Sequence, residues 1–543
     1  MKEKNYREDE LPDLDQQLES LPDESGYHDQ KKKAEGKSRS RRTDGEPKKK
    51  VERSRLKNGQ RRPKETQAER SGASKKKEKQ MTNKELTRVT YIFVTLFLVL
   101  MGYLVYFNVV KSEDFINSPY NTRQDTFSDR VIRGQILSSD GEILAKTDVY
   151  EDGTEDRIYP YANVFAHVVG YDSNGKSGLE SEANFQLLSS HEFFLNQMKN
   201  EFLGRKNMGD TVLSTLSAEL QTTAYYALGD RRGAVVAIEP STGKILAMVS
   251  KPDFDPNSIA ENWDWLVSDE TNSSLLNRAT QGQYPPGSTF KIVTALDYFR
   301  KNKSFNGYSY LCEGSITKED HTIRCYNGNV HGQEDFYSAF ASSCNCAFAE
   351  MGTSLGGASL RETSEDLLFN KKLPFTSYKK SVFSLNGKSG IPLTMQTAIG
   401  QGNTLVSPAH MALITCAIAN NGVVMKPYLI DQVVNNTGEH VSTTQPEAYK
   451  RIMTKNEATM LGELMKDVVE YGTASALSGQ GYTAAGKTGS AEYDEYGSSH
   501  SWFVGYSNVD DPDLAVAVIV EGGGTGSEAA VPIASQIFNA YYY

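Results

Sequence analysis

The sequence of 543 residues holds few of the side chains that build small disulfide-rich or metal-bound folds. It contains 5 cysteines, 8 histidines and 3 tryptophans. So few cysteines exclude a disulfide-stapled miniature domain and an array of zinc ribbons. A mean hydropathy of −0.51 excludes a membrane protein with many spans. The length suggests about three or four structural units of about 150 residues each.

The sequence has a single long apolar run, at residues 89–110, and its 22 residues include no charge. A helix rises about 1.5 Å per residue, so this run is long enough to cross a hydrocarbon core of about 30 Å. Tyr91, Tyr103 and Tyr106 lie towards its two ends, where amphipathic rings favour the membrane interface. The run lies too far along the chain, and is too long, for a cleaved signal peptide. It predicts one transmembrane helix.

The net charge of −10 is an average over segments of opposite sign. Residues 1–30 carry 3 basic and 10 acidic side chains, residues 31–88 carry 23 and 8, and residues 89–543 carry 33 and 51. The excess of Lys and Arg before the apolar run predicts that residues 1–88 are cytoplasmic and that the remainder lies on the other side of the membrane.

The segment before the apolar run has almost nothing to bury. Residues 24–88 are dominated by Lys, Arg, Glu, Ser, Gln and Gly. Such a segment cannot offset its ordering entropy with a core, so we expect residues 1–88 to form a disordered basic tail. Its basic runs contain no interleaved aromatic residues for stacking on bases. A solvated tail near anionic lipid is therefore favoured over a nucleic-acid-binding arm.

Residues 111–208 are expected to form a smaller external domain. Asp140-Gly141 separates two short apolar runs, a pattern typical of a β-hairpin. Nothing in this segment brings a nucleophile together with a base. We therefore interpret it as a pedestal or docking domain.

Residues 209–543 have the pattern of one compact mixed domain. The predicted elements are helices at 217–228, 288–299 and 408–420, a hairpin at 233–249, and strands at 481–492, 501–507 and 514–521. Connections as short as those between the last three strands allow only antiparallel pairing. We therefore predict an α+β fold in which one antiparallel sheet is flanked by helices.

The first chemical motif is Ser288-Thr-Phe-Lys291, which places a hydroxyl and an amine three residues apart on one face of a helix. Pro285-Pro286-Gly287 forces a turn directly before it, so Ser288 is expected at the helix N-terminus. Backbone N–H groups and the helix dipole favour developing negative charge there.

Two further motifs complete an ordered set. Ser343-Cys-Asn345 offers a second hydroxyl beside a side-chain amide, and residues 487–490 offer a cation and hydroxyls on a predicted strand. Gly489 would allow a ligand backbone to approach that strand closely. Each motif alone is weak, since six other serines also begin an S-x-x-K match. Their order and structural context are what discriminate.

This ordered set resembles the penicillin-binding protein and serine β-lactamase superfamily, and specifically the class B penicillin-binding proteins. The flanking matches lie at residues 277–279, 284–291, 399–402, 421–422, 470–474, 485–492 and 502–505. Residues 133–134, 140–141, 167–170 and 178–180 are similar to the family's N-terminal module. The resemblance covers nearly everything after residue 88.

The resemblance implies a peptidoglycan D,D-transpeptidase of the bacterial plasma membrane. It would cross-link stem peptides through an acyl-enzyme and bind penicillin covalently. The implied catalytic residues are Ser288 as nucleophile, Lys291 as base, Ser343 as proton relay and Lys487, and the implied substrate-binding residues are Asn345, Thr488, Gly489 and Ser490. Burial and the Lys487 cation would have to lower the pKa of Lys291 by about 3 units for it to act as a base.

The implied partners are D-Ala-D-Ala stem peptides, β-lactams and a separate SEDS-type glycan polymerase. Only 98 residues, 111–208, separate the predicted helix from the catalytic domain, and they lack the catalytic glutamate context of a polymerising domain. A D,D-carboxypeptidase side activity remains open. The alternatives are a β-lactam sensor, a β-lactamase and a catalytically idle scaffold. No cofactor and no nucleic-acid partner is expected.

The cysteines leave two alternatives. Cys312 and Cys325 lie 13 residues apart in a predicted external loop and could form a disulfide, which would contribute about 3 kcal/mol. Free thiols are an equal alternative, because Cys344, Cys346 and Cys416 leave an odd count. No cysteine has a histidine partner that would make it a nucleophile, and the histidines show no metal-ligand spacing. No metal site is therefore expected.

Overall fold

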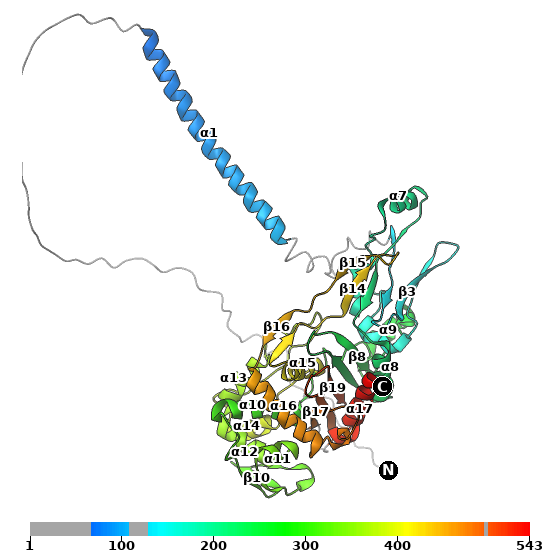
Figure 1. The fold of residues 1–543 in the computed structure, drawn as a ribbon, viewed down its shortest axis with the longest axis vertical. Coiled ribbons are helices and arrows are strands. Elements are labelled where there is room, and N and C mark those ends of the chain that lie inside the picture. Colours follow the sequence, from blue (N-terminus) through cyan, green and yellow to red (C-terminus); the bar gives the residue numbers. More distant parts are fainter. Residues whose placement is uncertain (1–66, 108–128, 494–497) are drawn as a thin grey trace, which may run out of the picture. The chain divides into compact units, whose positions relative to one another are not determined.

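The computed structural model describes residues 67–107, 129–493 and 498–543 (Figure 1). The first described element is helix α1 (Gln67–Tyr106). Within it, Lys84–Tyr106 is 23 residues long and apolar enough to cross a membrane, and its large apolar side chains are exposed. This agrees with the prediction of one spanning helix, whose last residues, 108–110, lie outside the described residues.

Helix α1 begins well before the apolar run, which corrects one expectation. Residues 67–88 were expected to be disordered with the rest of the tail, but they are helical. Ala, Glu, Lys and Gln are good helix formers, and extending an existing helix avoids the cost of nucleating a new one. The expected disorder of residues 1–66 concerns a part of the chain that lies outside the described residues.

The pedestal contains a sheet of six described strands in the order β15-β14-β6-β2-β3-β4. Its strands are β2 (Ile136–Leu137), β3 (Ile143–Val149), β4 (Glu155–Ile158), β6 (Thr211–Ser214), β14 (Ile430–Val434) and β15 (His440–Thr443). β2 and β3 form the predicted hairpin, and Gly141 in its turn has a φ of 87°. Figure 1 shows β14 and β15 (yellow) in the same part of the molecule as β3 (cyan), and β14 pairs with β6, although these strands come from distant parts of the sequence. The expected boundary at residue 208 is therefore crossed by this sheet.

A buried ion network holds the pedestal together. The Glu180 carboxylate accepts hydrogen bonds from Arg133 Nε at 2.6 Å and from Arg157 Nε at 2.8 Å. Arg133 also donates to the side-chain oxygen of Asn184. Burial raises the pKa of Glu180, but the two arginines outweigh burial and leave that pKa below its ordinary value. Arg133 and Glu180, which this network joins, both lie in segments that resemble the family's N-terminal module.

Short elements complete the pedestal. They are β1 (Val131–Ile132), α4 (Ala166–Val169), α5 (Gly178–Glu182), α6 (Asn184–Leu187), α7 (Phe194–Phe202) and β5 (Asn207–Met208). β1 pairs in parallel with β5. One hydrophobic cluster runs from Ile136 in β2 to Phe538 near the C-terminus, so the pedestal and the following domain share a continuous core.

The second domain is organised by a five-stranded antiparallel sheet, in the described order β17-β18-β19-β7-β8. Its strands are β7 (Gly233–Ile238), β8 (Ile245–Lys251), β17 (Ala484–Glu492), β18 (Ser499–Ser507) and β19 (Leu514–Val520). Every residue of β7 and β19 is buried, so both faces of the sheet are covered. The prediction of one antiparallel sheet flanked by helices is confirmed.

Four helices pack on this sheet. α8 (Ala218–Leu228) and α17 (Val531–Tyr542) pack against each other, α15 (Pro408–Ala419) packs on β7, β18 and β19, and α16 (Lys455–Glu470) packs on β17. Ser217 caps α8 by accepting a hydrogen bond from the Leu220 N–H. The predicted helices at 217–228 and 408–420 therefore match α8 and α15 within one residue.

Further helices and short strands lie between β8 and β17 in the sequence. They are α9 (Ile259–Ser268), α10 (Lys291–Asn302), α11 (Phe336–Ala341), α12 (Asn345–Leu355), α13 (Gly357–Asp366), α14 (Ile391–Ala398), β9 (Tyr310–Cys312), β10 (Ser315–Lys318), β11 (His321–Arg324), β12 (Gly332–Glu334), β13 (Val423–Met425) and β16 (Ala448–Arg451). β10 pairs with β11, and β12 pairs with β9. These two small ribbons lie between α10 and α11 in the sequence and pack on α12.

Candidate active site

Ser288 lies in a short 3-10 turn, η6 (Gly287–Phe290), directly before α10. The turn is fixed by Gly287, whose φ is 53° and whose N–H donates to the Gly400 carbonyl at 2.9 Å. Trp502 Nε1 donates to the Pro285 carbonyl at 3.0 Å and ties the same turn to β18. Ser288 was expected at the start of a helix, and the structure places it one turn before the α-helical part begins.

Lys291 is the first residue of α10 and is completely buried. Its Nζ donates to the Ser343 carbonyl at 2.6 Å, to Ser343 Oγ at 3.1 Å and to Asn345 Oδ1 at 2.8 Å. Burial lowers the pKa of Lys291 from 10.5 to about 8, while nearby thiols and Glu334 act in the opposite direction. About a tenth of the Lys291 amine is therefore neutral at about pH 7, far more than for an ordinary lysine.

Lys487 lies on β17 and is also completely buried. Its Nζ donates to Ser343 Oγ at 2.8 Å, so both lysine amines converge on one hydroxyl oxygen. Burial lowers the pKa of Lys487 well below its ordinary value, and the Lys291 cation lowers it further. This charge effect was expected on Lys291, but the structure places it on Lys487. It is therefore unfavourable for Lys291 and Lys487 to be protonated at the same time.

The Ser343 backbone has a φ of 58°, in the left-handed region that residues with a side chain rarely adopt. Strained conformations of this kind persist only where the surroundings fix them. Asn345, the first residue of α12, is held by Lys291 through its Oδ1 and donates from Nδ2 to the Arg324 carbonyl at 2.9 Å. Hydrogen bonds to Lys291 and to the Arg324 carbonyl thus hold the segment from Ser343 to Asn345 in place.

The third motif occupies β17, which is the edge strand of the described sheet. The Thr488 and Thr473 hydroxyls share a hydrogen bond. A Cβ at Gly489 would lie 3.0 Å from Thr289 Cγ2 and 3.1 Å from the Pro286 carbonyl oxygen, so glycine lets β17 approach the η6 turn. The Ser490 carbonyl packs directly against Gly287.

The structure therefore brings together residues from all three motifs around the η6 turn and the edge of β17. Thr473 joins them, although the sequence analysis did not single it out as a site residue. The only signal for it was its place in the flanking match at residues 470–474, because its contact with Thr488 depends on the packing of α16 against β17.

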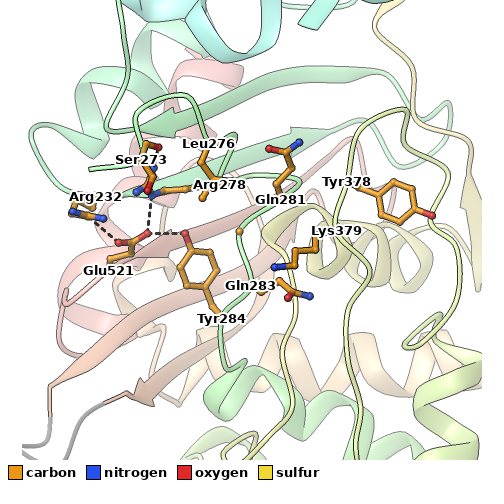
Figure 2. Close-up of a pocket in the computed structure, with 11 residues that line it drawn as sticks. Arg232, Ser273, Leu276, Arg278, Gln281, Gln283, Tyr284, Tyr378, Lys379 and Glu521 are labelled. Carbon is orange, nitrogen blue, oxygen red and sulfur yellow. Dashed lines mark hydrogen bonds and ion pairs between the residues drawn. The ribbon is translucent and has the colours of Figure 1, made fainter. Parts of the chain in front are cut away.

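A polar cavity of about 610 Å³ lies next to the segment that leads into the η6 turn (Figure 2). Ser288, Lys291 and Lys487 do not line it. Glu521 accepts hydrogen bonds there from Arg278 Nε at 2.8 Å, Arg232 Nε at 3.0 Å and Tyr284 OH at 2.7 Å. Since Tyr284 directly precedes the two prolines, this network anchors the approach to Ser288. We interpret the residues that line the cavity as a structural support for the turn that carries Ser288.

All five cysteines are free thiols in the structure. The disulfide that was left open is absent, since Cys312 Sγ and Cys325 Sγ are 3.7 Å apart. Three of the cysteines nevertheless cluster with His331, although the spacing of these residues gave no expectation of a metal site.

Comparison with known proteins agrees with this geometry. The family model of the penicillin binding protein transpeptidase domain matches residues 233–539, and that of the penicillin binding protein A dimerisation domain matches residues 133–212. The peptidoglycan D,D-transpeptidase PbpA of Mycolicibacterium smegmatis is 32% identical over 483 residues, which are 83% of this chain and 97% of that protein.

Solved structures agree in the same way. The D,D-transpeptidase domain of a peptidoglycan glycosyltransferase from Eggerthella lenta is 30% identical, with a TM-score of 0.69 over 76% of this chain and 98% of that one. Penicillin-binding protein A from M. tuberculosis, as a ceftriaxone acyl-enzyme complex, is 28% identical, with a TM-score of 0.70 over 77% of this chain and all of that one. The transpeptidase match alone spans more than half of the residues, and the chain belongs to the penicillin-binding protein transpeptidase family.

Proposed function

We propose that this protein is a peptidoglycan D,D-transpeptidase with Ser288 as its nucleophile. The observation that carries the proposal is the position of Ser343 Oγ, which accepts hydrogen bonds from the buried amines of both Lys291 and Lys487. A hydroxyl between two amines that lose their protons readily can pass a proton in either direction. Two of the relatives named above, from Mycolicibacterium smegmatis and Eggerthella lenta, carry the same activity in their names.

In the acylation step, Ser288 Oγ attacks the carbonyl carbon between the two terminal D-alanines of a stem peptide. Neutral Lys291 accepts the hydroxyl proton, as its pKa of about 8 permits. The C–N bond then breaks, and Ser343 passes a proton to the departing D-alanine amine, with Lys487 and Lys291 supplying it. The stem peptide remains as an ester on Ser288.

In the second step, the amine of another stem peptide attacks this ester carbonyl. Its proton returns through Lys291, the ester C–O bond breaks and Ser288 recovers its hydroxyl. The product is the cross-link. Attack by water in place of the amine would give the D,D-carboxypeptidase side activity. Penicillin would acylate Ser288 by the first step, with its strained amide in place of the D-Ala-D-Ala bond.

The residues around Ser288 have separate roles in substrate binding. The substrate peptide would lie along the open edge of β17, as in strand addition to a sheet. Thr488 and Ser490 would receive the terminal carboxylate together with Lys487, and Asn345 would hold the peptide backbone. The N–H groups of Ser288 and Ser490 would stabilise the oxyanion, where one donor contributes about 3 kcal/mol.

The proposal also covers the cellular location of the protein and its protein partner. The excess of Lys and Arg before the span supports a cytoplasmic N-terminus and an extracytoplasmic catalytic domain at the bacterial plasma membrane. The enzyme would act with a separate SEDS-type glycan polymerase that supplies uncross-linked strands. The described part of the chain between span and catalytic domain, from residue 129, belongs to the pedestal, and the sequence of residues 111–208 lacks the catalytic glutamate context of a polymerase.

Labelling with a fluorescent penicillin tests the nucleophile. The wild type should be labelled covalently, and Ser288→Ala should not. Ser241→Ala is the matched control, because Ser241 also begins an S-x-x-K match but lies exposed in the β7–β8 turn. Labelling of Ser288→Ala at the wild-type rate would contradict the assignment. Rapid loss of the label would favour a β-lactamase.

A reconstitution assay tests the reaction itself. The full chain is incubated with lipid-linked substrate and a glycan polymerase, and the products are digested and separated. Dimeric muropeptides are expected, and they should vanish with Ser288→Ala. Release of D-alanine without dimers would indicate a carboxypeptidase instead.

A further inference from the structure

Three cysteines and one histidine converge beside the Ser343 segment. The Sγ atoms of Cys312, Cys325 and Cys344 and a ring nitrogen of His331 all lie within 4.8 Å of one another. The three cysteines are buried and His331 is partly buried. They come from four places in the chain: the end of β9, the residue after β11, the residue before β12 and the N-cap of α12.

Three of the six separations between these atoms match those of a tetrahedral zinc site, and all six are below 4.8 Å. Cys325 Sγ lies 3.7 Å from Cys312 Sγ and 3.7 Å from Cys344 Sγ, and Cys312 Sγ lies 3.4 Å from His331 Nδ1. Zinc binds thiolate sulfur at about 2.3 Å and imidazole nitrogen at about 2.0 Å. The edges of such a tetrahedron are about 3.8 Å between two sulfurs and about 3.5 Å between sulfur and nitrogen. Thiolate and imidazole ligands are also those that zinc prefers.

A disulfide is the other chemistry open to this cluster. It requires sulfur atoms about 2.05 Å apart and joins only two of them. Cys325 Sγ is instead equally far from Cys312 Sγ and Cys344 Sγ. Cys346 Sγ also lies 3.4 Å from Cys325 Sγ, but Cys346 does not belong to the group of four. One shared cation accounts for three sulfurs and a nitrogen that all lie within 4.8 Å of one another, whereas one disulfide bond does not.

We propose that Cys312, Cys325, His331 and Cys344 bind one zinc ion, and that this ion fixes the position of the catalytic segment from Ser343 to Asn345. Four protein ligands fill a tetrahedron and leave no open position for substrate, so the site is structural. No metal site was expected from the sequence, because the ligands follow one another at intervals of 13, 6 and 13 residues. They do not form the closely spaced pairs of a zinc ribbon.

The contacts around the cluster explain why it would affect catalysis. Cys344 lies between Ser343 and Asn345 in the sequence. The Asn345 side chain donates a hydrogen bond to the carbonyl of Arg324, the residue before Cys325. On the other ribbon, Glu334 accepts a hydrogen bond from Ser342 Oγ at 2.6 Å. The metal would join both ribbons to the segment in which Ser343 holds its left-handed backbone. The ligands are positioning residues and touch no reacting atom.

Metal analysis of the full chain tests the site directly. The protein is purified in detergent without a metal-binding tag or chelator, and zinc is measured by mass spectrometry beside a count of thiols under denaturing conditions. Stoichiometric zinc with five titratable thiols is expected. Cobalt substitution should give thiolate-to-cobalt charge-transfer absorption. Absence of zinc with five free thiols, or two thiols lost to a disulfide, would overturn the proposal.

Variants separate this cluster from other thiols. Cys312→Ser and His331→Ala should each lose zinc, whereas Cys416→Ser should retain it, because Cys416 is a buried free cysteine on α15 outside the cluster. Zinc retained in both ligand variants would place the metal elsewhere. Because metal content is read without any enzymatic assay, its failure is distinguishable from failure of the proposed transpeptidase function.

The positioning role has its own readout. After removal of zinc by a chelator, the penicillin acylation rate should fall at least tenfold while circular dichroism retains the native fold, and added Zn²⁺ should restore the rate. A rate that is unchanged in zinc-free protein would contradict the positioning role. A rate that is lost together with the fold and does not recover would also contradict it.

Discussion

Lys487 Nζ donates a hydrogen bond to Ser343 Oγ at 2.8 Å, although 144 residues separate the two in the sequence. The contact links the edge strand β17 to the N-terminal end of α12. Ser343 Oγ also accepts a hydrogen bond from Lys291 Nζ, so the protonation states of Lys291 and Lys487 depend on each other. The proposed proton path therefore runs between two elements that only the tertiary fold brings together.

We predict that Lys487→Ala slows acylation by penicillin by about 10²–10⁴, the usual range for loss of one member of a proton-transfer system. Lys291 still contacts Ser343 in this variant, so the nucleophile should remain usable but slow. The second-order rate constant of acylation is the measurement. Lys466→Ala, which changes a lysine on the outer side of α16, is the control. An unchanged rate in Lys487→Ala would remove Lys487 from the relay.

We predict that acylation by penicillin increases with pH up to about 8 and then levels off. Lys291 must be neutral to accept the Ser288 proton, and burial lowers its pKa to about 8. The expected slope below that pH is about tenfold per unit. A pH profile of the acylation rate constant on the full chain measures this. A rate constant that does not change between about pH 6 and about pH 9, a range that includes the pKa of Lys291, would contradict its role as base.

The same pKa predicts a change in stability with pH. Between about pH 8 and 10.5 the unfolded chain keeps the Lys291 proton and the folded chain has lost it, so the free energy of unfolding rises with pH. Below pH 8 Lys291 therefore costs the folded state about 3 kcal/mol. Denaturant titration of the wild type and of Lys291→Met at several pH values measures the difference. The advantage of Lys291→Met should shrink as the pH rises through this window.

Local patterns were sufficient to predict the catalytic sheet. The strands predicted at residues 481–492, 501–507 and 514–521 are observed at 484–492, 499–507 and 514–520, because apolar runs with such short connections permit little else. The turn before Ser288 was predicted because two prolines and a glycine restrict the backbone there. In each case the determining interactions lie within a few residues along the chain.

Features that depend on distant residues were not predicted. The pedestal sheet recruits β14 and β15 across the expected boundary, since pairing with β6 is set by tertiary contacts and not by any local signal. The left-handed backbone of Ser343 is likewise imposed by its neighbours in space. The thiol and imidazole cluster draws its four side chains from separate elements, so no spacing rule identifies it.

We predict that Glu180→Gln destabilises the protein by about 3–5 kcal/mol, because it leaves Arg133 and Arg157 buried without a countercharge. Thermal or denaturant unfolding measures the loss. The folded fraction should still be acylated at the wild-type rate, since the network lies in the pedestal. Glu151→Gln, at an exposed position, should change neither quantity. A stability equal to that of the wild type would mean that Glu180 is not needed to balance the two arginines.

We predict that Gly489→Ala lowers the acylation rate at least tenfold, about 1.4 kcal/mol or more, with little loss of stability. The added Cβ would meet Thr289 Cγ2 at 3.0 Å, the Pro286 carbonyl oxygen at 3.1 Å and Trp502 Cβ at 3.1 Å. Two of these atoms belong to the turn that carries Ser288, so β17 must move away from it. A displaced β17 separates Thr488 and Ser490 from the nucleophile and misplaces the oxyanion donors.

Gly387→Ala is the matched control for this change. Its Cβ would meet only the Ala358 Cβ, at 3.6 Å, an ordinary contact. The acylation rate constant and the unfolding temperature of both variants are measured side by side. If Gly489→Ala is acylated as fast as Gly387→Ala, the close approach of β17 to the η6 turn is not what aligns the substrate. If Gly489→Ala instead unfolds at a much lower temperature, the glycine serves packing of the sheet rather than the site.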